Sequence, residues 1–404
     1  MSENRKPLAD SFLGPDYNRL FSRQWEPWLA GVLLGLINVM MFAYAKAWGV
    51  ADGVQNWGNW VLLGMGVEVG EQSPPWMHTT SVVLIALVVG AGISALLAGE
   101  FRIRMTTRRD LIRSALGGIL LGIGSTLGLG CTIGGFFTAY SAMSLAGPLF
   151  MLGLMVGAWV GLKVLVWDLG RETPTTPKPR AEKSSGVDWG RWQPLIGLVL
   201  LVLLVWYFAF MDEAAFSTSG IEGLRGVLVL FGLALGVISQ RSRLCFVRAF
   251  REPYMTGEGA MTKGVILAVL VGLIGFSIIK GTALSDYRPV EANVSPTVWF
   301  GSLMGGIIFG IGMVLTGGCA SGSLWRLGEG QVKFVLVLGL FAVTNALFTQ
   351  VVQSNALRDV WGDTEVFVPD VLDWPLALVV MAGFLLVWYL IVVWNEKTGK
   401  LQID

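Results

Sequence analysis

The chain has 404 residues, of which 54% are hydrophobic and only 14% are charged. Because charged residues make up about a quarter of soluble domains, this composition excludes an ordinary soluble protein. The formal net charge of +1, the three cysteines without a CxxC pair and the single histidine, His78, indicate no nucleic-acid partner, disulfide framework, metal site or cofactor.

Long uncharged runs separate the clusters of charge along the chain. No charged residue lies between Arg113 and Lys163, or between Glu291 and Arg326. A helix that crosses a membrane needs about 20 mostly apolar residues, and about ten segments meet this criterion. They are residues 28–48, 79–99, 112–130, 146–167, 193–211, 226–246, 262–280, 298–317, 334–354 and 374–394. The sequence therefore predicts an all-α polytopic membrane protein embedded in the lipid bilayer.

The charges in the loops predict the orientation of these segments. Loops within 102–113, 171–191 and 241–251 are rich in arginine, and the intervening loops are rich in aspartate and glutamate. By the positive-inside rule, both termini are expected in the cytoplasm, and residues 51–78 and 355–373 are expected to be outer loops. The predicted divisions are a cytoplasmic tail (1–25), a first membrane repeat core (26–169), a Pro/Thr-rich cytoplasmic linker (170–192), the last helix of the first repeat (193–212), a second membrane repeat (213–396) and a C-terminal tail (397–404).

An internal duplication organises the chain. Residues 117–134 align without a gap with residues 305–322, at an offset of 188 residues that also separates Cys131 from Cys319. Ten positions are identical, including six glycines and the cysteine. Five spans in each half imply that the second repeat enters the membrane from the opposite side. Secondary transporters with inverted repeats place their substrate site at the repeat interface, near the midplane of the membrane.

Glycines surround the two duplicated cysteines. Because glycine is a poor helix former and lets the backbone approach a ligand closely, we expect short broken or re-entrant helices that point from Cys131 and Cys319 toward a shared central path. Close helix packing explains the GxxxG pairs Gly118–Gly122 and Gly306–Gly310. A third cysteine, Cys245, lies in an arginine-rich segment. Its first-half counterpart is predicted within 38–45, where no cysteine occurs.

Three segments carry a resemblance to the YeeE/YedE family of bacterial inner-membrane proteins. They are Gly128–Gly135, Gln240–Arg251 and Gly317–Gln331. The resemblance implies a duplicated hourglass-like fold with short helices that meet near the centre. It also implies thiosulfate transport by cysteine S–H hydrogen bonds, location in the inner membrane, and a cytoplasmic sulfur-carrier protein as a partner. A related sulfur or selenium anion is an alternative substrate, because the YedE branch has been linked to selenium.

The candidate substrate-binding residues follow from these motifs. They are Cys131, Cys245, Cys319, Gly130, Thr132, Gly318, Ser321 and Arg248. No catalytic residue or metal ligand is predicted, and Glu329 and Gln331 are expected to brace the loop after Cys319. A membrane sulfurtransferase is the alternative function, in which Cys245 carries sulfur as a persulfide. A purely structural membrane subunit leaves the duplicated Gly-Cys turns unexplained.

Overall fold

The computed structural model describes residues 23–170, 189–210, 221–282, 294, 300–354 and 365–402. These residues form helices and connecting turns and contain no β-strand. Nearly all of the predicted N-terminal tail and most of the predicted linker lie outside the described residues. The all-α architecture expected from the sequence is confirmed.

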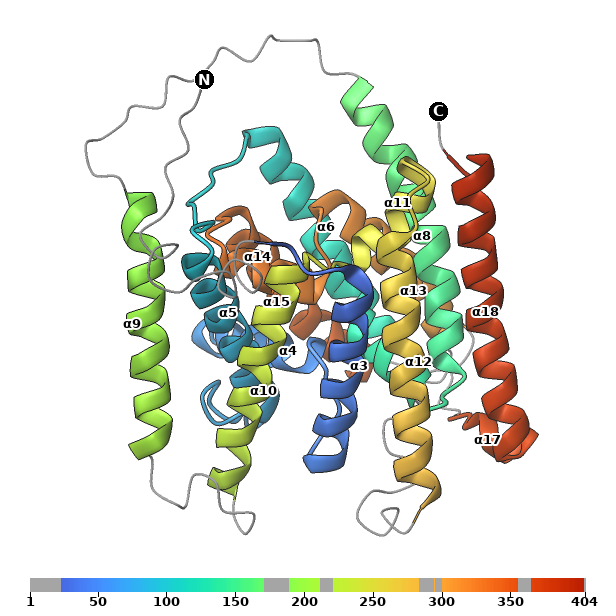
Figure 1. Ribbon diagram of the computed structural model, residues 1–404, viewed down its shortest axis with the longest axis horizontal. Helices are drawn as coiled ribbons and strands as arrows, with labels where there is room; N and C mark the ends of the chain where they lie inside the picture. Colours follow the sequence, from blue (N-terminus) through green and yellow to red (C-terminus); the bar gives the residue numbers. More distant parts are fainter. Residues whose placement is uncertain are drawn as a thin grey trace.

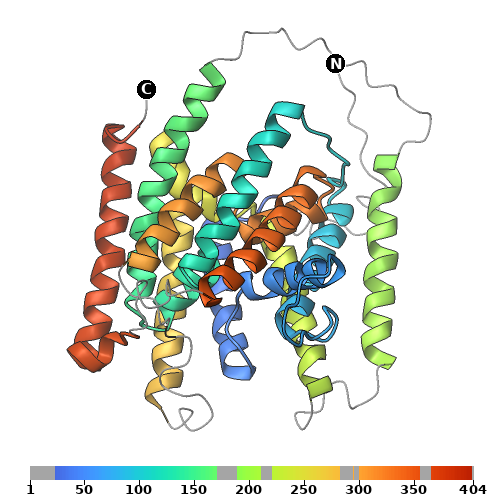
Figure 2. The same ribbon diagram turned by 180° about the vertical axis from the view of Figure 1, so that it is seen from behind.

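Nine segments of the described chain are long and apolar enough to cross a membrane. Seven are single helices, and two consist of a long helix followed by a short one. The single helices are α3 (Pro27–Tyr44), α5 (Thr79–Leu97), α6 (Arg108–Leu127), α8 (Ala146–Gly170), α12 (Ala260–Gly281), α15 (Lys333–Ser354) and α18 (Trp374–Thr398). The pairs are α10 (Ile221–Ser242) with α11 (Phe246–Met255), and α13 (Phe300–Thr316) with α14 (Ala320–Gly328). The remaining predicted span, 193–211, corresponds to α9 (Trp189–Phe210), which lies at one edge of the molecule, with α18 at the other edge (Figures 1 and 2).

Short helices occupy places where loops or simple turns were expected. Residues 51–78 were predicted as an outer loop, but α4 (Ala51–Gly64) occupies its first half. The glycines of this segment serve as packing surfaces, which allows a helix to form within the predicted loop. A methyl group at Gly58 would lie 2.0 Å from the Ala342 carbonyl oxygen, so α4 packs closely against α15. The other short elements are the π-helix η2 (Thr132–Thr138), α7 (Ala139–Ser141) and α17 (Val368–Leu372).

Corresponding helices of the two halves make corresponding contacts. Helix α8 packs against α13 as α15 packs against α6, and α5 packs against α10 as α12 packs against α3. Glycines make these close approaches possible. A methyl group at Gly118 would lie 2.9 Å from the Val337 carbonyl oxygen of α15, and one at Gly306 would lie 2.5 Å from the Phe150 carbonyl oxygen of α8. The packing role expected for the GxxxG pairs is confirmed.

Candidate functional site

Each of the three cysteines lies immediately before a short helix. Cys131 is the N-cap residue of η2, Cys245 of α11 and Cys319 of α14. Two residues before each cysteine, the backbone adopts a positive φ angle, which reverses the chain ahead of the helix. These residues are Leu129 (48°), Arg243 (52°) and Gly317 (71°). The same turn therefore delivers all three thiols, and the expected break of the helices at the cysteines is confirmed.

Two of the cysteines form a pair. The buried thiols of Cys245 and Cys319 face each other beside Gly322. Cys319 Sγ also accepts a hydrogen bond from the Gly322 N–H (3.3 Å) and lies 3.4 Å from Ser321 Oγ. A methyl group at Gly322 would lie 3.2 Å from Cys319 Sγ and 3.3 Å from Cys245 Sγ. The two sulfur atoms therefore face one narrow space between the starts of α11 and α14.

Cys131 lies where the starts of η2 and α4 meet. Its Sγ accepts a hydrogen bond from the Ile133 N–H at 3.4 Å. The backbone N–H groups of Val50, Ala51 and Gly134 also lie near this sulfur. Because Val50 is the N-cap residue of α4, Cys131 meets the start of a second short helix, as Cys319 does.

The first-half counterpart of Cys245 is Val50, and the prediction that it lies within 38–45 was wrong. Val50 precedes α4 as Cys245 precedes α11. Asn38, at the start of the predicted range, has a structural role instead. Its Oδ1 accepts the Trp48 N–H (2.9 Å) and its Nδ2 donates to Thr138 Oγ1 (3.4 Å), which holds the turn before α4 against η2.

A basic cavity of about 290 Å³ adjoins the paired cysteines. We call it the inner cavity. Four of its eight lining residues are cationic. The lining residues are Arg243, Arg248, Gly317, Trp325, Arg326, Gln331, Lys333 and Phe334. Such a lining favours an anion.

A second cavity of about 340 Å³, the outer cavity, adjoins Cys131 through Val50, Gly130 and Gly134. Its charged lining residues among those described are Lys46 and Asp52, which form an ion pair at 2.7 Å. Burial by itself raises the pKa of Asp52, but the Lys46 ammonium, His78 and a hydrogen bond from Thr80 outweigh it and hold the pKa below its usual value. The outer cavity is therefore close to neutral.

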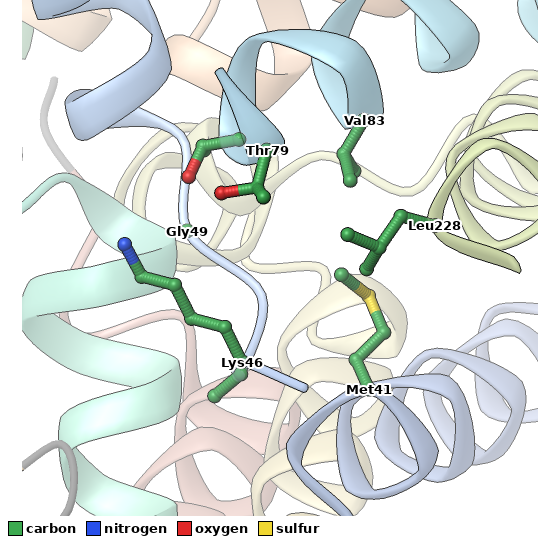
Figure 3. Close-up of a pocket in the computed structure, with 8 residues that line it drawn as sticks. Met41, Lys46, Gly49, Thr79, Val83 and Leu228 are labelled. Carbon is green, nitrogen blue, oxygen red and sulfur yellow. The ribbon is translucent and has the colours of Figure 1, made fainter. Parts of the chain in front are cut away.

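A small gap next to the outer cavity shares Lys46 and Gly49 with it. Figure 3 shows Met41, Val83 and Leu228 pointing toward one another across this gap, whereas the Lys46 ammonium points away from them. Its volume of about 10 Å³ is that of a single water molecule. The gap is too small for a sulfur oxyanion, so the outer cavity is the larger opening on this side.

The two cavities lie at opposite ends of α6. Lys333 of the inner cavity bonds to Asp110 in the first turn of α6 at 3.2 Å, and Leu129 and Gly130 of the outer cavity directly follow the end of this helix. A helix of 20 residues is about 30 Å long. The distance between the cavities is thus comparable to the thickness of the hydrocarbon core of a membrane.

Aromatic rings lie between the outer and inner cysteine turns. Phe136 and Phe137 of η2 contact Phe246 of α11, with ring centroids 6.4 Å and 6.2 Å apart respectively. All three rings are buried, and Phe246 directly follows Cys245. The helix that starts at Cys131 is therefore packed against the helix that starts at Cys245. The sequence did not predict a role for these phenylalanines, because apolar residues in a membrane helix carry no local signal of their position.

The remaining predicted residues lie near the three cysteine turns. Gly130 and Thr132 flank Cys131, and a methyl group at Gly130 would lie 2.4 Å from the Gly135 nitrogen. Gly318 and Ser321 belong to the Cys319 turn. Arg248 lines the inner cavity and forms an ion pair with Glu252 in the next turn of α11.

A buried polar network holds the inner cysteine turns in place. Arg243 pairs with Glu329 at 3.1 Å and with Glu100 at 3.0 Å, and Gln240 donates to both carboxylates. Glu329 follows α14, whereas Arg243 lies in the turn before Cys245. The network confirms the bracing role predicted for Glu329. Glu100 was missed, because its partners lie about 140 residues away in the sequence.

A family model described as sulphur transport matches residues 7–160 and 241–404. The chain belongs to this family. The match includes all three cysteine turns and confirms the YeeE/YedE resemblance seen in the sequence.

Three relatives illustrate the range of the family. The probable transporter YedE of Escherichia coli is 28% identical over 334 residues, which are 77% of each chain. The thiosulfate transporter TsuA of Escherichia coli is 36% identical over 130 residues, covering 32% of this chain and 33% of TsuA. TsuA of Spirochaeta thermophila is 35% identical over 102 residues, or 25% of this chain and 29% of that protein. Both the family and these relatives support a membrane transporter of sulfur compounds.

Proposed function

We propose that the protein is a permease for thiosulfate or a related small sulfur or selenium anion. The observation that carries the proposal is the repeated turn that places each cysteine at the start of a short helix, next to a cavity or to another cysteine. Two of the relatives are named thiosulfate transporters. Their similarity to this chain supports thiosulfate as the first substrate to test.

The proposed path runs from the outer cavity past Cys131 and then past the Cys245–Cys319 pair to the inner cavity. The corresponding packing of the two halves supports an inverted repeat, with the path at its interface. The phenylalanines between the outer and inner turns close the path at rest. An anion passes when these rings change rotamer, so that the closed structure opens toward one cavity at a time.

The thiols suit a soft anion. A protonated thiol is a weak hydrogen-bond donor without charge, so it neither repels an anion nor holds it too tightly. Conduction requires several weak sites, because entry must be favourable while exit stays easy. The helix that begins at each cysteine adds partial positive charge from its N-terminal N–H groups. The anion is therefore stabilised without a fixed cation at the centre of the membrane.

Uptake must also overcome the membrane potential. We propose that the inner cavity and the termini face the cytoplasm of a bacterial inner membrane. Moving a dianion into a negative cytoplasm costs about 4–5 kcal/mol per 100 mV, from about 2.3 kcal/mol per charge. Consumption of the anion inside the cell, for example by a sulfur-carrier protein at the inner cavity, lowers its internal concentration and supplies this driving force.

The experiment is uptake of labelled anions into proteoliposomes that contain the purified protein. Thiosulfate, sulfate, sulfite and selenite are compared for the wild type and for Cys131→Ala, Cys245→Ala and Cys319→Ala. Thiosulfate uptake that drops at least tenfold in each variant, at equal protein incorporation, is the expected result. Normal uptake by a variant lacking all three cysteines refutes the thiol path.

A membrane sulfurtransferase remains the second candidate, because Cys245 lies beside another thiol and is followed closely by Arg248. In that mechanism the thiolate of Cys245 attacks the sulfane sulfur of thiosulfate, forms a persulfide and releases sulfite. Mass spectrometry separates the two candidates. An added mass of one sulfur atom on Cys245 after exposure to thiosulfate supports the transferase, and an unmodified Cys245 during active uptake supports the permease.

A further inference from the structure

The cations of the inner cavity differ in their partners. Three of the four are paired with carboxylates. The pairs are Arg243 with Glu100 and Glu329, Arg248 with Glu252, and Lys333 with Asp110. Arg326 has no carboxylate partner within the described part of the chain. Its guanidinium instead donates to the Gly317 carbonyl and lies over the rings of Trp325 and Phe334, with its Cζ 4.9 Å and 5.7 Å from their centroids.

The guanidinium group of Arg326 lies beside the Cys319 turn. A methyl group at Gly318 would be 3.3 Å from Arg326 Nη1 and 3.0 Å from Ser323 Oγ. The Ser323 side chain is fully buried, and its hydroxyl has no hydrogen-bond partner among the described residues. A buried hydroxyl without a partner is energetically costly. The guanidinium and this hydroxyl therefore converge on the residue next to Cys319.

We propose that Arg326 and Ser323 form a binding site for the oxygen end of the transported anion, between the cysteine pair and the inner cavity. This inference rests on the proposed transport function and deepens it. The ligand class is an oxyanion with a trigonal face of oxygen atoms, such as the sulfonate-like end of thiosulfate. In that pose the terminal sulfur points back toward Cys245 and Cys319.

The chemistry of the guanidinium supports this assignment. Arginine has five N–H donors in a planar fork, and the Gly317 carbonyl accepts from Nη1. The remaining donors can bind two oxygen atoms in the bidentate geometry that arginine forms with oxyanions. The Trp325 and Phe334 rings hold the guanidinium plane in place. Lysine, a compact point charge, cannot reproduce this fork.

The first test measures thiosulfate uptake into proteoliposomes as a function of concentration. Arg326→Gln is expected to raise the KM at least tenfold, and Arg326→Lys at least fivefold. The matched control is Arg104→Gln, which removes one positive charge from an exposed side chain whose backbone pairs with Gln331 near the same cavity. A KM for Arg326→Gln no higher than that of the control overturns the proposal, and so does wild-type transport by Arg326→Lys.

A second measurement uses the unaltered protein and stays informative if a variant fails to fold. Phenylglyoxal modifies accessible guanidinium groups, and peptide mass mapping follows its reaction with Arg326. Thiosulfate is expected to slow this reaction at least threefold relative to chloride, and the same thiosulfate protection is expected to be lost in Ser323→Ala. Equal reaction rates in thiosulfate and chloride overturn the proposal.

The two tests separate this inference from the proposed function. If the wild type takes up thiosulfate and depends on its cysteines while Arg326→Gln behaves like the control, only the oxyanion site is refuted. If the wild type transports no sulfur anion, the transport function is refuted. Protection of Arg326 by thiosulfate in that case still establishes anion binding at this place.

Discussion

A single methyl group at Gly322 tests whether the space between the paired thiols conducts the anion. Gly322 and Gly134 occupy equivalent positions in the duplicated segments. Their surroundings differ, because a methyl group at Gly322 would lie 3.2 Å and 3.3 Å from the two sulfur atoms, whereas one at Gly134 would meet no atom within 4 Å. Gly322→Ala therefore fills the space between the thiols, and Gly134→Ala is its matched control.

The size of the effect follows from these distances. Comfortable contacts between heavy atoms lie at about 3.5–4.0 Å, so the added methyl group pushes both sulfur atoms away by a few tenths of an ångström and shields their S–H groups. Loss of two hydrogen bonds to the anion, at about 0.5–1.5 kcal/mol each, amounts to about 1–3 kcal/mol. This corresponds to about a 5- to 150-fold decrease in uptake.

The assay is initial thiosulfate uptake at a concentration below the KM, with protein incorporation measured for each variant. Thermal unfolding in detergent is measured in parallel, and Gly322→Ala is expected to unfold within a few degrees of the wild type, because alanine favours a helix over glycine. Gly134→Ala is expected to retain more than a third of the wild-type uptake. Equal uptake by the two variants would show that the space between the thiols is not part of the path.

Three further predictions follow from the cysteine pair, the buried network and the outer cavity. Mild oxidation with copper phenanthroline is expected to join Cys245 to Cys319, because both sulfur atoms face the same narrow space beside Gly322, and to abolish uptake until a reductant is added; peptide mapping that finds both thiols free contradicts the pairing. Glu329→Gln leaves the half-buried Arg243 with one carboxylate fewer and is expected to destabilise the protein by about 1–3 kcal/mol, seen as a lower unfolding temperature; an unchanged value means that the network contributes nothing to stability. Asp52→Asn removes the negative charge that neutralises the outer cavity and is expected to lower the thiosulfate KM about three- to tenfold, since two unit charges 4 Å apart interact by about 1 kcal/mol even in bulk water. Burial lowers the pKa of His78 below its ordinary value of 6.5, so this ring gains its charge only as the pH falls below 6.5, and the wild-type KM is expected to fall there too; a KM that does not change between pH 7 and 5 contradicts a role for this group.

Local patterns were sufficient to predict the membrane class and the cysteine turns. An uncharged, apolar segment of about 20 residues matches the hydrocarbon core of a membrane, where a helix satisfies its backbone hydrogen bonds internally. Composition alone therefore indicated a polytopic helical protein. The duplicated glycines and cysteines lie within one short segment, and glycine is a poor helix former that permits a chain reversal. The sequence alone therefore predicts that Cys131, Cys245 and Cys319 lie at the ends of apolar segments.

Tertiary structure decided which of these residues meet and what surrounds them. The helix within residues 51–78 was not predicted, because the helix surfaces that stabilise α4 belong to α5 and α15. Likewise, the proximity of Cys245 to Cys319, the ion pair of Glu100 with Arg243 and the absence of a carboxylate beside Arg326 among the described residues depend on contacts between distant segments. A sequence determines what each segment can bury, but the partner of a buried charge or thiol is chosen by packing across the whole molecule.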